Sequence, residues 1–124
     1  DEEAWGVDGI WRNGPTTVWA GYDEKCVDPQ GINEITASGW YTELSHFVPW
    51  QGADDRLELV AGWQQFDPGA AAPPQLEADW LTLGANYHIE GCSEQVRLQY
   101  IRRDEATNSV DNDTVLLQYE KVFK

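Results

Sequence analysis

In three stretches rich in aliphatic and aromatic residues, polar side chains fall at positions separated by an even number of residues. Alternate residues of a strand point to the same face of its sheet, so each set would form one polar face. Charged and amide groups on a wet face act on passing ions through local potential and hydrogen bonds. The candidates for this chemistry are Glu58 and Gln64 in the first stretch, Asn86 and His88 in the second, and Arg97, Gln99 and Arg103 in the third.

A plainer role is open to the same residues, since Arg97 and Glu58 could form an ion pair that only holds the wall of the sheet. Other chemistry is not indicated. His88 does not belong to a set of four converging ligands of the kind that a zinc site needs. The acidic segment 104–113, "DEATNSVDND", lacks the central glycine and spacing of a calcium loop. With no nucleophile elbow and no phosphate-binding glycine loop, we expect no enzyme, no metal and no cofactor.

Length and charge exclude further classes. The chain has 124 residues, which is typical of one domain, and a formal net charge of -14 at pH 7. Tight binding to nucleic acid is not expected, because neutralising phosphates requires clustered Lys and Arg. No apolar run approaches the length of a membrane helix. The chain contains no Met, which leads us to expect a processed chain or a fragment of a longer one.

Alternation at period two predicts an all-β fold of about seven strands. The predicted strands are 5–12, 16–24, 35–48, 56–66, 80–89, 95–103 and 113–123. The connections between them are alternately short, as at 13–15, and long, as at 25–34. This pattern favours an antiparallel up-and-down meander with tight turns at one end and long loops at the other, as in outer-membrane β-barrels.

Aromatic residues gather near both ends of the predicted strands. A membrane barrel carries such residues in two girdles, one at each interface with water. The residues that we predict to face lipid or join a girdle are Trp11, Trp63, Trp80, Tyr87, Tyr100, Tyr119 and Phe123.

The two cysteines fall at opposite ends of the predicted strands, Cys26 in a long connection and Cys92 in a short one. A disulfide needs Cα atoms within roughly 7 Å of each other. A full strand would separate these two residues, so we predict no disulfide between them.

Several segments resemble the phosphate-selective (polyphosphate-selective) porins of Gram-negative outer membranes. These are "LELVAGWQQFDP", "LTLGANYHIEG", "VRLQYIRRDE" and "NDTVLLQYEKVF", preceded by "AWGVDGIWRNGPTTVWAGY" and "ASGWYTELSHFV". The resemblance covers nearly the whole chain and corresponds to the C-terminal half of such a porin. It implies part of a sixteen-stranded, homotrimeric barrel in the outer membrane that passes solutes or ions through a constricted pore. The chain has only eight basic residues, so phosphate selectivity is not carried over.

Strand direction adds one expectation. The last predicted strand would run from outside to inside, leaving the C-terminus periplasmic, and the first would run the same way. Single-chain bacterial barrels have even strand counts, so an odd number of strands, most simply nine, would be missing. Open edges are costly in lipid. We therefore expect outer-membrane lipid and further barrel strands, from the same protein or other chains, as partners.

A second hypothesis comes from a different class of protein. A soluble, secreted β-sandwich could bury its apolar faces between two sheets and bind carbohydrate through exposed tryptophans. The side chains that would stack on sugar faces are Trp40, Trp63 and Trp80. Such a module could also pair its cysteines.

Overall fold

The computed structural model describes residues 2–27, 35–48, 57–69, 77–89, 93–105 and 113–123. These residues form seven strands and no helix. The strands are β1 (Glu2–Asn13), β2 (Thr16–Val27), β3 (Ile35–Val48), β4 (Leu57–Asp67), β5 (Ala78–His88), β6 (Glu94–Glu105) and β7 (Thr114–Lys121). The prediction of an all-β fold with seven strands is confirmed, and the bounds differ mainly at strand ends.

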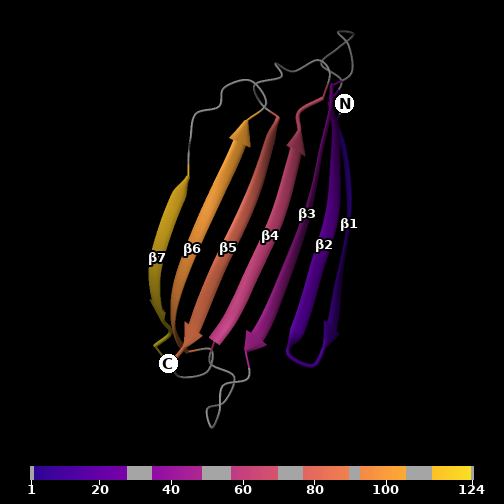
Figure 1. The fold of residues 1–124 in the computed structure, drawn as a ribbon. Coiled ribbons are helices and arrows are strands. Elements are labelled where there is room, and N and C mark those ends of the chain that lie inside the picture. The colour runs from indigo at the N-terminus through magenta and orange to yellow at the C-terminus, as the bar shows by residue number, and fades with distance from the viewer. Residues whose placement is uncertain are drawn as a thin grey trace.

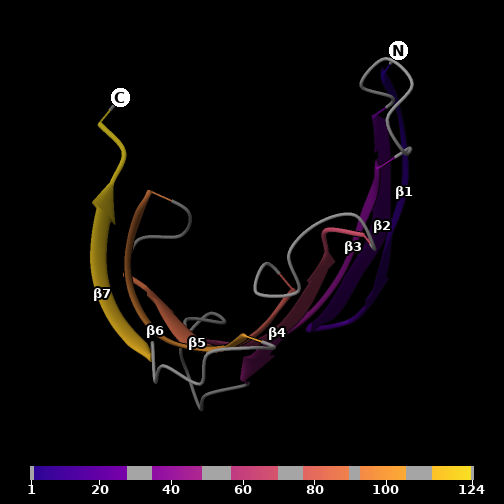
Figure 2. The same ribbon diagram turned by 90° about the horizontal axis from the view of Figure 1, so that it is seen from above.

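The strands form one antiparallel sheet in which every neighbour in sequence is a neighbour in space, in the order β1-β2-β3-β4-β5-β6-β7. Figure 1 shows this meander, with β1 and β7 at its two edges and running in the same direction. The sheet does not close on itself. Seen from above, it curves into an open trough, and its two edge strands stand apart (Figure 2). This shape is consistent with a partial barrel, as the predicted up-and-down meander requires.

The hairpin between β1 and β2 is the tightest connection in the described part of the chain. Gly14 has a φ of 55°, a conformation that glycine adopts without steric cost. Pro15 follows, and its ring fixes φ near -65°. Positive φ at the first central residue and negative φ at the second are the requirement of a two-residue type II′ hairpin. The backbone N–H of Phe47 donates to the carbonyl of Pro15 at 2.9 Å, which ties the turn to β3.

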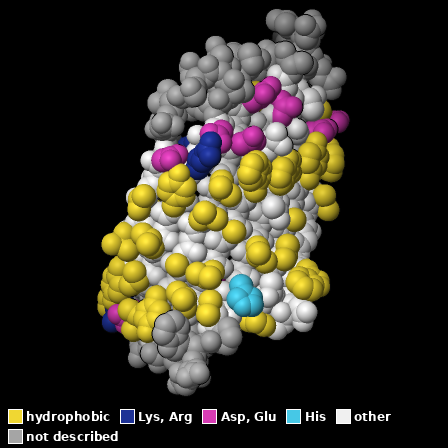
Figure 3. Space-filling model, viewed as in Figure 1, with side chains coloured by type: hydrophobic (Ala, Val, Ile, Leu, Met, Phe, Trp, Pro, Cys, Tyr) yellow, Lys and Arg dark blue, Asp and Glu magenta, His cyan; other side chains and the backbone are white. Residues whose placement is uncertain are grey.

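The strand register divides the side chains into two sets. Trp11 lies opposite Val18, and Val18 lies opposite Leu44, so apolar residues continue across the strands on one face. Leu117 lies opposite Leu98 in the same set. Figure 3 shows this convex face, where hydrophobic side chains spread over the middle of the sheet. The polar candidates occupy the concave face.

The described residues contain no buried hydrophobic core. A soluble sheet covers its apolar face with a second layer, but the described strands supply only one sheet. They therefore do not form the two-sheet sandwich of the second hypothesis. On the convex face Val115 is 71% exposed and Leu117 is 72% exposed. No described helix is long and apolar enough to cross a membrane.

Candidate functional site

The register places all seven predicted polar candidates on the concave face. Glu58 lies opposite Asn86, which lies opposite Arg97, so three strands contribute to one cross-strand row. Nearer the end that carries the N-terminus, Gln64 and Arg103 flank Trp80 in a second row. His88 and Gln99 belong to the same face. That these residues share a face agrees with the sequence pattern, and their lining of a pore remains a prediction.

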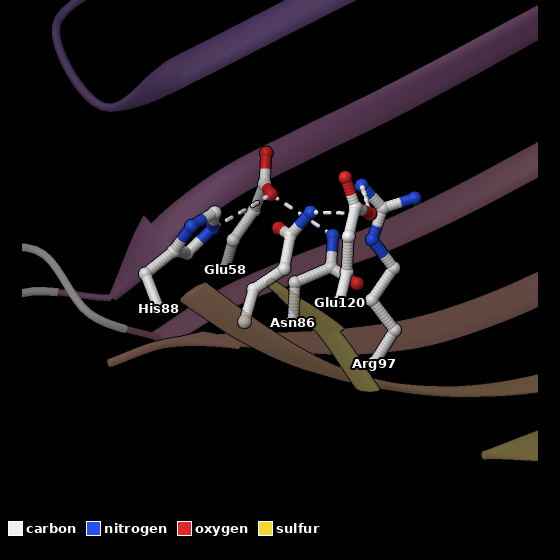
Figure 4. Close-up of polar contacts among 6 residues, drawn as sticks. Glu58, Asn86, His88, Arg97 and Glu120 are labelled. Carbon is white, nitrogen blue, oxygen red and sulfur yellow. Dashed lines mark hydrogen bonds and ion pairs between the residues drawn. The ribbon is translucent and has the colours of Figure 1, made fainter. Parts of the chain in front are cut away.

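The lower half of the concave face holds a polar cluster around Glu58 (Figure 4). The side-chain amide of Asn86 donates to Glu58 Oε2 at 3.0 Å, and His88 Nε2 lies 3.4 Å from the same oxygen. The side chains of His88 and Glu58 are only 14% and 16% exposed. The ring of Phe47 lies 5.4 Å from the His88 ring. The curvature of the sheet thus shelters one carboxylate among two hydrogen-bonding partners and an aromatic ring.

A second carboxylate completes the cluster from the edge strand. Arg97 Nη2 lies 3.3 Å from Glu120 Oε2, and Gln95 Nε2 donates to the same oxygen at 3.0 Å. Gln95 is 8% exposed and is the only buried polar residue among those that the structure describes. Two buried atoms of the cluster, Asn86 Oδ1 and Arg97 Nε, have no hydrogen-bond partner. The cluster therefore keeps hydrogen-bonding capacity unused inside the trough.

The suggestion that Arg97 and Glu58 form an ion pair is wrong, because each side chain contacts a different partner. Glu58 contacts Asn86 and His88 instead, while Arg97 contacts Glu120. Register explains the difference, because Asn86 stands between Glu58 and Arg97 in the row. Alternation along a strand shows which face a side chain is on, but not which residue of the next strand lies beside it. Gln95 and Glu120 were on the correct face by the same alternation, and only the strand pairing identifies them as members of the cluster.

The remaining candidates are not part of this cluster. Gln64 and Arg103 lie farther along the trough, in the row of Trp80, and Gln99 lies opposite Gly84 between the two rows. The structure thus brings four of the predicted residues together and spreads the other three along the same face. The four are Glu58, Asn86, His88 and Arg97.

Most of the predicted girdle residues lie on the convex face. Trp11, Trp63, Tyr87, Tyr100 and Tyr119 all belong to its set by register. Phe123 follows β7 and is 82% exposed. Trp80 is a correction. It lies opposite Gln64 and Arg103, so it faces the trough. Its position near a strand end suggested a girdle, but its even spacing from Thr82 and Asn86 assigns it to the polar face.

Hydrogen bonds anchor the convex aromatics to polar groups nearer the strand ends. At the N-terminal end, Tyr22 OH donates to Glu24 Oε2 at 2.8 Å, and Trp5 Nε1 donates to Glu24 Oε1 at 3.3 Å. Trp40 Nε1 donates to Gln65 Oε1 at 2.6 Å. Acidic side chains gather beyond this band at the same end of the face (Figure 3). Each ring therefore combines an apolar body with a wet polar tip, as interfacial aromatics do.

The opposite end of the convex face has a similar arrangement. Tyr119 OH donates to Glu94 Oε1 at 2.6 Å, and Lys121 Nζ lies 3.5 Å from Glu94 Oε2. Lys121 Nζ also lies 5.9 Å from the centre of the Phe123 ring. An ammonium group at that distance is attracted to the face of the ring. Aromatic side chains with polar partners thus mark both ends of the apolar band.

Cys26 is a free thiol whose Sγ lies 3.4 Å from Thr36 Oγ1. Cys92, the other half of the disulfide question, lies outside the described residues. Within the part of the chain that the structure describes, no group of three or more His, Cys, Asp or Glu side chains could hold a metal ion.

Comparison with known proteins gives no assignment. No family model matches this chain, no curated protein matches it, and no solved structure matches it. The function must therefore be argued from the two faces of the sheet.

Proposed function

We propose that this chain forms part of an outer-membrane β-barrel of the porin type. Its convex face would contact lipid, and its concave face would line a water-filled channel for passive diffusion of small solutes or ions. The porin type is suggested by the resemblance to phosphate-selective porins, and trimer formation belongs to the same proposal.

The apolar convex face carries this proposal. Large hydrophobic side chains remain exposed on it, with Leu98 at 51%, Val115 at 71% and Leu117 at 72%. An uncovered apolar surface of this kind marks contact with a membrane or another protein. Its aromatic residues lie toward both ends and donate to polar groups beyond them, which matches two interfacial girdles.

The dimensions support the same reading. A strand that crosses a bilayer obliquely needs about 9–11 residues. β1 and β2 have 12 residues each, and β4 and β5 have 11 each. Such strands span the hydrocarbon region and leave a residue or two at the interfaces.

The concave face supports a channel because it is polar and holds partly unsatisfied groups. The Glu58 cluster, defined as Glu58, Asn86, His88, Gln95, Arg97 and Glu120, lies on the trough wall near the end that would be periplasmic. Charged and amide groups at such a position set which solutes pass through local potential and hydrogen bonding. In this proposal the cluster is a positioned part of the channel wall.

The edges imply additional strands. β1 and β7 are unpaired on their outer sides in the described sheet, and unpaired backbone groups are costly in lipid. Because both edges run in the same direction, antiparallel closure takes an odd number of further strands. These would come from the same protein or from other chains.

Two single-tryptophan variants of the full chain test the proposal. One retains only Trp40, which is on the convex face, and the other retains only Trp19, which is on the concave face. Both would be folded into vesicles whose acyl chains carry bromine. We expect bromine to quench Trp40 fluorescence strongly and Trp19 weakly, and iodide in the water to show the reverse order.

Equal quenching of the two tryptophans would contradict the assignment of faces. A chain that stays monomeric in buffer without detergent would contradict the membrane location itself. Conductance across planar bilayers then tests the channel, and a lipid-inserted chain that never conducts with its partner strands present would remove that part of the proposal.

A further inference from the structure

A hollow of 430 Å³ lies on the concave face, away from the Glu58 cluster. Small-molecule sites usually enclose about 300–1,000 Å³. Its lining includes the side chains of Trp19, Tyr41, Glu43, Gln64, Thr82 and Gln99.

One wall of the hollow is aromatic. The rings of Trp19 and Tyr41 meet edge to face, with centroids 5.1 Å apart and planes inclined at 80°. The Tyr41 ring lies over Gly21, because a Cβ built at Gly21 would come within 2.6 Å of it. Tyr41 therefore leans toward β2 and supports Trp19, whose side chain is still 42% exposed. The result is a fixed and accessible indole.

The floor of the hollow exists because of a glycine. Trp19, Glu43, Gly62 and Thr82 are consecutive members of one cross-strand row. Only Gly62 lacks a side chain in this row, and a Cβ there would meet its nearest atoms at 3.7 and 3.8 Å. These are ordinary contact distances, so a larger residue fits the backbone but would occupy the open space.

Much of the remaining lining of the hollow is polar. Glu43, Gln64, Thr82 and Gln99 offer a carboxylate, two amides and a hydroxyl. No described side chain forms a hydrogen bond with any of these four. Among the residues that the structure describes, no Lys or Arg lines the hollow. An anion would meet the Glu43 carboxylate without a compensating positive charge, so phosphate and similar ions are disfavoured.

We propose that this hollow is a binding site for a neutral sugar ring on its way through the trough. The apolar C–H face of such a ring would stack on Trp19, and its hydroxyls would bond with Glu43, Gln64 and Gln99. An aromatic platform with a few placed polar groups is the usual composition of a small-molecule site. The inference rests on the proposed function, because a sugar ring would pass over the hollow during diffusion only if the concave face is the channel side.

The test measures binding of maltose to the full chain folded in a zwitterionic detergent that contains no sugar. Saturation-transfer NMR reports contact with the sugar protons, and a titration gives the dissociation constant. Trp19→Ala should weaken binding about tenfold, since one aromatic stack with its apolar contact is worth roughly that factor. Trp40→Ala is the matched control, because Trp40 is exposed to a similar extent but lies on the convex face.

A second pair of variants tests whether the open space above Gly62 is needed for binding. Gly62→Val should abolish maltose binding by filling the hollow. Gly9→Val is its control, since a Cβ at Gly9 meets nothing within 4 Å and Gly9 belongs to the convex set. Inorganic phosphate should give no saturable response with any variant.

The outcomes separate the two proposals. No maltose binding, or equal loss in Trp19→Ala and Trp40→Ala, overturns the sugar site. Binding of phosphate in place of maltose also overturns it and assigns the hollow to anions. Quenching of Trp40 by brominated lipid, measured on the single-tryptophan variant in vesicles, decides the membrane location separately. Sugar binding without lipid contact would contradict the channel and leave a soluble binding protein.

Discussion

The two faces of this sheet place similar residues in opposite surroundings. Leu116 and Leu117 are neighbours in β7, yet Leu117 is 72% exposed on the convex face and Leu116 is 41% exposed in the trough. Trp40 and Trp19 differ in the same way by face, although their exposed fractions are close, 38% and 42%. In a protein with its core inside, such apolar residues would be sheltered. Here the apolar set lies on the outside of the curve, and its solvent is therefore expected to be hydrocarbon.

The largest expected effect comes from placing a charge on the convex face. Leu117→Arg should destabilise the chain folded in lipid vesicles by about 2–4 kcal/mol, the cost of a basic residue near the bilayer midplane of a barrel. Urea unfolding in those vesicles measures it. Leu116→Arg is the matched control, because its side chain points into the trough and can reach water. Similar losses for both variants would show that the two faces do not differ in solvent.

The next largest loss of stability is expected on removing Glu58, the sheltered carboxylate of the cluster. Glu58→Ala removes the acceptor for Asn86 and the partner of His88. Because these side chains are mostly covered, we expect a loss of about 1–3 kcal/mol, the usual cost of leaving buried polar groups without a partner. The same urea titration applies, with Asp8→Ala as the control for an exposed carboxylate on the same face.

A double-mutant cycle sharpens the same comparison. His88→Ala, Glu58→Ala and the double variant together isolate the interaction between the two side chains. A coupling free energy indistinguishable from zero would mean that the cluster is only solvated and does not shape the wall.

A smaller loss of stability is expected at Gly21, over which the Tyr41 ring lies in contact with Trp19. Gly21→Val would bring a side chain against the Tyr41 ring, which must then swing away from Trp19. We expect a loss of about 1 kcal/mol, at the low end for overpacking because the end of one side chain can move. Near-ultraviolet circular dichroism should report the lost ring contact. Gly9→Val, which meets nothing within 4 Å, should leave both the spectrum and the stability unchanged.

Much of this architecture could be predicted from period-two alternation. The faces of Glu58, Asn86, His88 and Arg97 follow directly from it, since a strand side chain can point only one way or the other. The partners of these residues could not be predicted, because they depend on register between strands joined by connections of unequal length. The girdle prediction for Trp80 relied on its position near a strand end. Its even spacing from Thr82 and Asn86 is the better guide and places it on the concave face.

The hollow could not be predicted for a different reason. Its floor depends on Gly62 being level with Trp19 and Thr82, which lie on other strands. A sequence shows that a glycine interrupts a strand, but not which side chains stand around the gap. Its support depends on Tyr41 lying over Gly21, a cross-strand contact that alternation also leaves open.

The smallest effect distinguishes an exposed ion pair on the concave face from the sheltered polar contacts of Glu58. Lys25 Nζ lies 3.2 Å from Glu2 Oε2, closer than His88 lies to Glu58, but these side chains are 53% and 67% exposed. Water and salt screen such a pair, so Lys25→Gln should cost about 0.5 kcal/mol or less. The glutamine keeps part of the aliphatic stem, which limits the change to the charge. Repeating the urea titration in concentrated salt should reduce even this difference, while the effect of Glu58→Ala should persist. A loss for Lys25→Gln as large as that for Glu58→Ala would show that exposure does not govern the strength of polar contacts in the trough.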